Sequence, residues 1–318
     1  MDDADILCAG IIVADHVCAP IDHLPTAGEL VMADNMLLTI GGCAANVAVD
    51  LTRLGVPATV VGCVGDDIFG RIVADMLREN QVNVSGLRVK AGLDTSQTLI
   101  VNVKGQDRRF IHTFGANGHF SAADFPLDRL SRCKILYVGG YLAMPKLTQD
   151  ALAEVFAQAR SLGVKTYLDV VVPGPGNWTG QLDTLLPHTD VFKPNHHEGA
   201  IITGESDPLR QAEAFRRLGA KTVIVSLGSE GAMLVNDQVR LRSGIFSMPN
   251  VDSSGGGDAF SAGFMCGLLR NLGPEDCLRM GSALGGSCVR AIGTTPGVFT
   301  RAECEAFLES HELKIDRI

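Results

Sequence analysis

Residues 135–170 read ILYVGGYLAMPKLTQDALAEVFAQARSLGVKTYLDV, and this stretch contains two strand patterns with a helix pattern between them. Residues 135–138 form a short apolar run, residues 147–162 have the spacing of an amphipathic helix, and residues 166–170 are mostly apolar again. Short apolar runs on either side of a helix indicate parallel strands joined by a crossover. The stretch therefore predicts an α/β fold.

The same alternation continues toward the C-terminus. It predicts a helix near residues 181–186, a strand at 190–193, helices from His196 and over 207–218, and a strand at 222–226. Such a repeat is typical of a doubly wound, mostly parallel sheet with helices on both faces. Three further helix patterns should cover one side of this sheet, at residues 258–271, 274–291 and 301–310. With 318 residues, we expect one domain spanning residues 1–318.

Two segments interrupt this repeat. The first strand pattern ends near Asp15, but the first good helix begins only at about Gly42, whereas a βα connection usually takes about 2 to 6 residues. Residues 98–114 have the pattern of an antiparallel hairpin. We expect residues 15–40 and 98–114 to pair into a small β-sheet lid over the carboxyl ends of the parallel strands. The alternative is two irregular surface loops. The lid is also a candidate surface for a homodimer.

Composition limits the class of protein. The net charge of -9 argues against a nucleic-acid surface, and no apolar run approaches the roughly 18 residues of a membrane helix. The acidic N-terminus does not resemble a secretory or transit signal, so we expect a cytoplasmic location. The nine cysteines are scattered and never spaced as Cys-x-x-Cys, which indicates reduced thiols rather than disulfides or a zinc site.

The strongest candidate for chemistry is DSSGGGD at residues 252–258, which opens the helix pattern of residues 258–271. Three glycines at a helix start let backbone N–H groups turn toward an anion, and the helix dipole adds positive potential. Asp258 lies in the first turn, where its carboxylate could take a proton from a substrate hydroxyl that attacks phosphorus. The structural alternative is a flexible turn whose aspartate complements the helix dipole.

Three weaker motifs accompany it. Gly41 and Gly42 allow a ligand to approach the backbone, and Asn46 offers hydrogen bonds to hydroxyl groups, although small residues here could simply pack a helix against a sheet. Asn195 and Glu198 are spaced to hold magnesium through waters, or to form a capping box. The SLGSEG motif at residues 226–231 suits either nucleotide contact or a hairpin turn.

Several nucleotide-binding signatures do not occur in the sequence. There is no Gly-x-x-x-x-Gly-Lys-Ser/Thr loop, no Gly-x-Gly-x-x-Gly fingerprint, and no His-Arg-Asp or Asp-Phe-Gly pair. The motifs that do occur, in chain order, are an Asp after strand one, Gly-Gly-x-x-x-Asn, Asn-x-x-Glu, Leu-Gly-x-x-Gly and Asp-Ser-x-Gly-Gly-Gly-Asp. This series resembles the ribokinase-like, or PfkB-type, carbohydrate kinase family over essentially the whole chain.

The resemblance implies an ATP- and Mg²⁺-dependent kinase that phosphorylates a hydroxyl of a small sugar. It implies that Asp258 is the catalytic base and that three glycines form the anion hole, namely Gly255, Gly256 and Gly257. The implied acceptor site is Asp15, Gly41, Gly42 and Asn46. The implied ATP and magnesium contacts are Asn195, Glu198, Ser226, Gly228 and Gly231. Residues 293–297, with Asp252 and Ser254, look like the loops that bind a monovalent cation such as K⁺ in some members.

Departures from the family pattern concern the substrate more than the chemistry. The family more often has Ala at Gly256 and Thr at Ser253, and neither change removes the base or a backbone donor. Cys43 stands where ribokinases usually carry Lys, which argues against ribose. A nucleoside kinase is an alternative, disfavoured because only 5% of residues are aromatic. A non-catalytic nucleotide or sugar sensor is another, disfavoured because Asp258, Asn195 and Glu198 are retained.

The sequence of the hairpin also indicates the charge of the acceptor. Alternate residues of a strand face opposite sides, so Arg108 and Arg109 cannot both point inward. One inward arginine suits a neutral or singly anionic acceptor, whereas a sugar phosphate usually requires several convergent cations. The pattern therefore predicts a preference for an unphosphorylated sugar.

Overall fold

The computed structural model describes residues 6–106, 108–174 and 176–318. In these ranges a ten-stranded sheet has the order β14-β13-β12-β11-β10-β9-β8-β1-β4-β5. Its strands are β1 (Ile6–Gly10), β4 (Ala58–Gly65), β5 (Asn83–Lys90), β8 (Ile135–Tyr141), β9 (Lys165–Val170), β10 (Val191–Lys193), β11 (Thr222–Ser226), β12 (Ala232–Asn236), β13 (Arg240–Ser243) and β14 (Ile315–Arg317). The strands from β11 to β5 are parallel, and β12, β13 and β14 extend one edge in antiparallel fashion.

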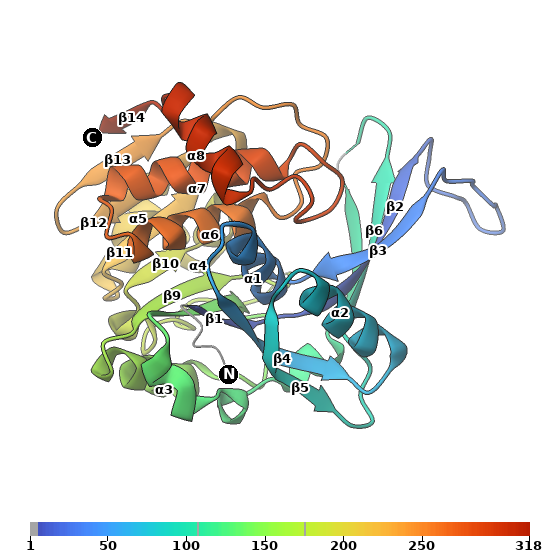
Figure 1. The fold of residues 1–318 in the computed structure, drawn as a ribbon, viewed down its shortest axis with the longest axis horizontal. Helices are drawn as coiled ribbons and strands as arrows, with labels where there is room; N and C mark the ends of the chain where they lie inside the picture. The colour runs from blue at the N-terminus through green and yellow to red at the C-terminus, as the bar shows by residue number, and fades with distance from the viewer. Residues whose placement is uncertain (1–5, 107, 175) are drawn as a thin grey trace.

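The helices of the chain cover both faces of this sheet, as the sequence predicts. They are α1 (Cys43–Arg53), α2 (Ile68–Glu79), α3 (Gln149–Ser161), α4 (His196–Thr203), α5 (Pro208–Arg217), α6 (Gly256–Leu269), α7 (Pro274–Cys288) and α8 (Arg301–Ser310). One apolar core contains Leu51, Phe264 and Leu284, and joins α1, α6 and α7 to one face. A second core contains Phe156 and Phe215, and joins α3 and α5 to the other face (Figure 1).

Short 3₁₀ helices complete the described structure, at Gly115–His119, Ala122–Asp124, Leu127–Arg132, Leu186–His188 and Gly228–Glu230. The helix predicted near residues 181–186 is wrong, because turns occupy this segment and only Leu186–His188 is helical. The buried Leu182 and Leu185 produce a helical spacing, but Pro187 ends the segment within two turns. None of the described helices combines the length and hydropathy needed to cross a membrane.

A separate four-stranded sheet stands at the right of the central sheet in Figure 1. It contains β2 (Val13–Ile21), β3 (Met36–Gly41), β6 (Gln97–Val103) and β7 (Arg109–Thr113), in the order β3-β2-β6-β7. The pairs β2–β3 and β6–β7 are antiparallel, while β2 and β6 run parallel. The predicted pairing of residues 15–40 with residues 98–114 is confirmed.

The predicted end of the first strand near Asp15 is wrong. Strand β1 ends at Gly10, and Asp15 lies inside β2 of the small sheet. The break between β1 and β2 is not visible in the sequence pattern, because residues 6–15 are buried on both sides of it. The side chain of Asn117 stabilises the junction, accepting a hydrogen bond from the Ile12 N–H at 3.2 Å and donating to the Ile12 carbonyl at 2.9 Å.

The order of the strands predicts where a ligand binds. From β1 the chain builds outward through β4 and β5 on one side, and from β8 through β9, β10 and β11 on the other. The junction of β1 and β8 is therefore the topological switch point of the sheet. Ligands of doubly wound folds bind outside the carboxyl ends of the strands at such a point.

Asp50 is an acidic residue in the interior of α1, and it is fully buried. Its carboxylate oxygens have no hydrogen-bond partner among the described residues. Burial raises the pKa of Asp50 well above its ordinary value, and the nearby charge of Asp258 adds to this while Arg53 opposes it. An aspartate in the unfolded chain has a pKa of about 3.9, so the folded state binds the Asp50 proton more tightly than the unfolded state does. The stability that this carboxyl contributes therefore falls as the pH rises above about 4.

We expect Asp50→Ala to increase the free energy of unfolding at neutral pH by about 1 to 3 kcal/mol, which is the cost of an unsatisfied buried polar group. The loss of stability with rising pH should also become smaller. Asp75→Ala on the exposed part of α2 is the control for helix propensity. Chemical denaturation of both variants tests this, and an Asp50→Ala protein less stable than the parent would contradict it.

Candidate active site

Helix α6 begins directly after the glycine-rich stretch predicted to bind an anion. Gly255 is its N-cap and adopts a left-handed conformation with φ of 77°. The first helical hydrogen bond runs from the Ala259 N–H to the Gly255 carbonyl at 2.9 Å. The N–H groups of Gly256, Gly257 and Asp258 therefore precede the helical ladder and are available to an anion, with the positive end of the helix dipole behind them.

The glycines of this stretch differ in how well their positions would accept a side chain. A Cβ on Gly255 would lie 2.2 Å from the Thr294 carbonyl oxygen, and its positive φ adds strain. At Gly256 the nearest atom to an added Cβ is 3.5 Å away, which is ordinary contact. The alanine that the family often carries at this position thus fits the structure.

We expect Gly255→Ala to lower the free energy of unfolding by about 1 to 3 kcal/mol, because it combines a backbone clash with a disfavoured φ. Gly256→Ala is the matched control and should stay near the parent value. Thermal denaturation of the pair checks this expectation. Equal loss in both variants would show that the whole stretch, rather than Gly255, restricts side chains.

Asp258 lies in the first turn of α6 and is partly exposed. Burial raises the pKa of its carboxyl to about 6, and the negative charge of Asp169 acts in the same direction. A hydrogen bond from Asn46 Nδ2 to Asp258 Oδ2, 2.8 Å long, opposes the shift. A carboxyl with a pKa near physiological pH is suited to accept a proton and release it again.

Asn46 connects the base to the segment 293–297. Its Oδ1 accepts a hydrogen bond from the Thr294 hydroxyl at 2.9 Å, while its Nδ2 contacts Asp258. The Thr294 oxygen also lies 3.0 Å from the Ile40 carbonyl at the end of β3. The predicted site residues Asn46 and Asp258 are thus brought together. The part that Thr294 plays here was not predicted.

Asp15 faces the same region from the small sheet and is 6% exposed. Burial raises the pKa of its carboxyl to about 6, the Thr98 hydroxyl opposes the rise, and the charge of Asp258 adds to it. Gly41 makes room for this carboxylate, since a Cβ there would lie 1.9 Å from Asp15 Oδ2. Gly42 has φ of 89° and lies against the Ile11 carbonyl. The predicted acceptor residues therefore meet beside Asp258.

Asn195 and Glu198 form the capping box that was the structural alternative for this motif. Asn195 Oδ1 accepts from the Glu198 N–H at 2.8 Å, and Glu198 Oε2 accepts from the Asn195 N–H at 2.9 Å. Burial raises the pKa of Glu198 to about 7, and Asp169 adds to this. The described residues contain no group of three or more His, Cys, Asp or Glu side chains that could hold a metal by themselves.

These oxygen donors nevertheless fit Mg²⁺. This ion keeps several waters and is usually held by one or two carboxylates together with substrate phosphates. Glu198 has a second carboxylate oxygen beyond the one that completes the capping box. A dedicated protein cage is therefore not required for a magnesium site at Asn195 and Glu198.

A cavity of about 370 Å³ lies beside the start of α6. It brings together glycines and serines from four segments with an apolar wall. Its lining includes Ser226, Gly228, Gly231, Ser253, Gly256 and Gly257, and the wall includes Phe246, Met248 and Val289. The predicted ATP contacts on the 226–231 turn thus share one cavity with the anion-binding glycines.

A buried ion pair next to the site was not predicted. Lys193 Nζ lies 3.0 Å from Asp169 Oδ2, and both side chains are buried. Burial acts to lower the pKa of Lys193, but the charge and hydrogen bond of Asp169, together with Tyr167 and Asp258, outweigh it and raise that pKa above its ordinary value. A Cβ on Gly257 would lie 3.7 Å from Lys193 Nζ, which places this charge beneath the anion-binding turn. The sequence contains one signal for this pair, because a charged residue stands at or near the end of each of the two strand patterns, Asp169 in residues 166–170 and Lys193 in residues 190–193.

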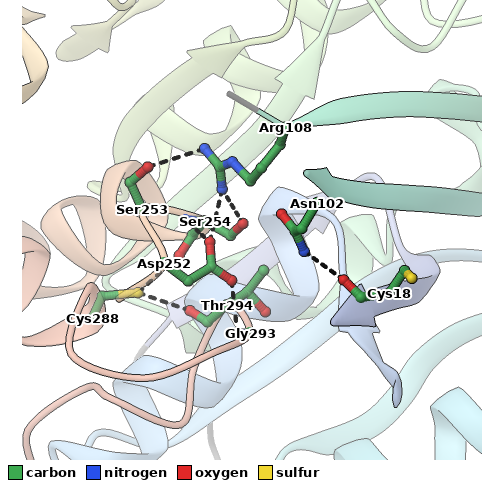
Figure 2. A network of polar contacts seen from close by, with 9 residues as sticks. All are labelled: Cys18, Asn102, Arg108, Asp252, Ser253, Ser254, Cys288, Gly293 and Thr294. Atoms are coloured by element: carbon green, nitrogen blue, oxygen red, sulfur yellow. Dashed lines mark hydrogen bonds and ion pairs between the residues drawn. The ribbon is translucent and has the colours of Figure 1, made fainter. Parts of the chain in front are cut away.

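The two adjacent arginines of the hairpin point in different directions, as predicted. Arg108 reaches the 252–254 stretch and donates to Asp252 Oδ1 at 2.9 Å (Figure 2). Arg109 is exposed and donates to Gln106 Oε1 at 2.6 Å. The small sheet therefore contacts the loop that leads into α6 through one arginine.

Comparison with known proteins agrees with this geometry. The profile of the pfkB family carbohydrate kinases matches residues 3–301, so the chain belongs to this family. A ribokinase from Haemophilus influenzae is 28% identical over 94% of this chain and 97% of its own length. An ATP-dependent 6-phosphofructokinase from Thermoanaerobacterium thermosaccharolyticum is 24% identical over 91% and 89%. The structure of Arabidopsis thaliana ribokinase complexed with ribose and ATP has a TM-score of 0.83 and 24% identity, covering 98% of this chain and 100% of that one.

Proposed function

We propose that this carbohydrate kinase transfers the γ-phosphate of ATP to a hydroxyl of an unphosphorylated sugar, with Asp258 as the base. The observation that carries the proposal is the position of Asp258. Its partly exposed carboxyl, with a pKa raised to about 6, lies between the first-turn N–H groups of α6 and the acceptor side formed by Asp15 and Asn46. A sensor without catalysis would have no need for a base at this place.

The proposed reaction follows from this arrangement. Asp258 accepts the hydroxyl proton as the sugar oxygen bonds to the γ-phosphorus, and the bond between that phosphorus and the bridging oxygen of ADP breaks. The N–H groups at Gly256 and Gly257 stabilise the charge on the transferred group. Asp15 and Asn46 orient the acceptor. When bound, Mg²⁺ supplies positive charge to the ATP phosphates, and Asn195 and Glu198 would hold it through waters.

The nucleotide is proposed to occupy the cavity beside α6. Ser226, Gly228 and Gly231 would contact ATP there, because they share this cavity with Gly256 and Gly257. The apolar wall suits an adenine ring. The apolar wall and the anion-binding glycines line the same cavity, as an ATP molecule with its adenine on the wall and its γ-phosphate at α6 requires.

The small sheet is proposed to act as a lid over the acceptor. It contributes Asp15 to the site and touches the 252–254 stretch through Arg108. Closure would exclude water, which could otherwise take the phosphate. Arg108 is engaged by Asp252 and Arg109 points away. The lid therefore does not offer the several convergent cations that a sugar phosphate usually requires.

An assay of turnover tests this proposal. ATP and Mg²⁺ are incubated with the protein and a panel of free sugars, nucleosides and sugar phosphates. We expect kcat/KM to be highest for a free sugar. Strong selectivity for a sugar phosphate or for a nucleoside would contradict the proposed acceptor, and binding without turnover of any compound would indicate a sensor.

The lid is also the proposed surface of a homodimer. Apolar side chains of its two edge strands are exposed, with Met36 63% and Ile111 68% accessible. Exposed apolar side chains on one small sheet are typical of an interface. We expect light scattering to give twice the mass of the chain, and Ile111→Glu to shift it to the monomer. A monomeric parent protein would contradict this assignment.

A further inference from the structure

The segment around Asp252 resembles the loops that bind a monovalent cation in some members of the family, but in this chain its oxygens are already engaged (Figure 2). Asp252 Oδ1 accepts from the Ser254 N–H at 2.9 Å and from Arg108 Nη1 at 2.9 Å. Asp252 Oδ2 accepts from the Gly293 N–H at 2.9 Å. Each carboxylate oxygen thus has a donor, and one donor carries a full positive charge.

The neighbouring carbonyl groups are engaged as well. The Cys288 thiol lies 3.1 Å from both the Ser254 and the Thr294 carbonyl oxygens, and its single S–H can donate to either of them. A potassium ion gives up its hydration shell only where several protein oxygens replace it. The oxygens that could do so here face N–H, guanidinium and thiol donors instead. The residues present therefore do not fit a K⁺ site in this arrangement.

We infer that the guanidinium of Arg108 takes the place of a monovalent cation at residues 252–254, so that phosphoryl transfer by this chain does not depend on K⁺. The inference rests on the proposed kinase function. Arg108 also donates to the Ser254 hydroxyl, and its Nη2 lies 3.1 Å from the Ser253 hydroxyl. One planar group thus neutralises Asp252 and holds both serines that precede the anion-binding glycines.

The position of this contact ties it to catalysis. Arg108 immediately precedes β7 of the small sheet, whereas Asp252 and the serines belong to the loop that leads into α6. Ser253 also lines the cavity proposed for ATP. The Arg108 and Asp252 side chains are 21% and 8% exposed, so water screens their attraction only partly. The small sheet thus supplies this charge to the loop. Arg108 is thus a positioning residue for the anion-binding turn.

The first measurement is made on the unmodified protein. Turnover is compared in K⁺, Na⁺ and tetramethylammonium at constant ionic strength, and the Tm is measured in the same three salts. We expect kcat to differ by less than about twofold between them, since a built-in charge leaves no role for the ion. A requirement for K⁺, or a Tm raised by K⁺ alone, would overturn the inference.

The second measurement uses Arg108→Ala with Arg109→Ala as the control from the same hairpin. We expect Arg108→Ala to lose about 10-fold to 100-fold in kcat, which corresponds to losing about one hydrogen bond to a charged group. K⁺ or free guanidinium at low concentration should restore part of the lost kcat and raise the Tm of the Arg108→Ala protein. Arg109→Ala should match the parent throughout.

Two results with the variants would overturn the inference. One is an Arg108→Ala protein with the parent kcat, and the other is a loss that no cation restores. The Tm comparison needs no substrate, so it decides the cation question separately from the kinase proposal. If no sugar is phosphorylated by the parent protein, the proposed function fails while the Tm data still report on Arg108.

Discussion

Replacing Asp258 by Asn should lower kcat by roughly 100-fold to 10,000-fold, which is the usual contribution of a positioned general base. Binding of ATP should remain nearly unchanged, because the N–H groups at the start of α6 are retained. The amide has almost the shape of the carboxylate but cannot accept the hydroxyl proton. Steady-state kinetics with the preferred sugar and calorimetric titration of ATP measure the two effects separately.

Asp276→Asn is a matched control for this variant. Asp276 also lies in the first turn of a helix, α7, but it is exposed and far from any predicted site residue in the sequence. If Asp258 only complemented the dipole of α6, both variants would show a small change in stability and normal turnover. Near-normal turnover by Asp258→Asn would therefore show that the base has been assigned wrongly.

The pH dependence of the reaction follows from the same carboxyl. The pKa of Asp258 is raised to about 6 by burial, so the base is protonated and inactive below that pH. Activity should fall as pH drops below about 6 and reach a plateau above it. Asp15 is raised to about 6 as well and is coupled to Asp258 by charge, so the pair is expected to titrate together.

Replacing Asp15 by Ala should mainly weaken binding of the acceptor. A buried carboxylate that accepts two hydroxyl hydrogen bonds contributes on the order of 1.5 to 3 kcal/mol for each bond, or about 10-fold to 150-fold in affinity. The affinity for ATP should barely change, because Asp15 lies on the small sheet, away from the cavity beside α6. Titration of each ligand separately gives the two affinities.

Asp22→Ala is the control for this second variant, since Asp22 follows the same strand but forms an exposed ion pair with Lys104. It should leave both affinities unchanged. An equal loss of sugar and ATP binding in Asp15→Ala would indicate misfolding or a site in another place.

Local patterns were sufficient to predict most of the fold, whereas the grouping of Asn46 with Asp258 was implied by the family resemblance. The strand and helix periods from residue 135 onward are those of elements buried on defined faces. Apart from the helix expected near residues 181–186, they fall within a few residues of the observed bounds. The capping spacing of Asn195 and Glu198 and the glycines before Asp258 describe short-range geometry, which a sequence records directly. Alternation along the hairpin was enough to separate Arg108 from Arg109.

Long-range contacts could not be predicted in this way. Nothing near Arg108 in the sequence indicates that it bonds to Asp252, which lies 144 residues away. The pairing of Asp169 with Lys193 depends on two neighbouring strands having the same register. The bend between β1 and β2 depends on Asn117, which follows more than a hundred residues later. Each of these features is determined by the tertiary structure rather than by local spacing.

The central claim is that Asp258 promotes transfer of phosphate from ATP to a sugar hydroxyl. The most direct measurement follows the reaction of ATP, Mg²⁺ and the preferred sugar by ³¹P NMR, with the parent protein and with Asp258→Asn. The account predicts a sugar phosphate ester that appears together with an equal amount of ADP, and at a rate at least about 100-fold lower in the variant. Binding of both ligands without formation of an ester, or equal rates in the two proteins, would contradict it.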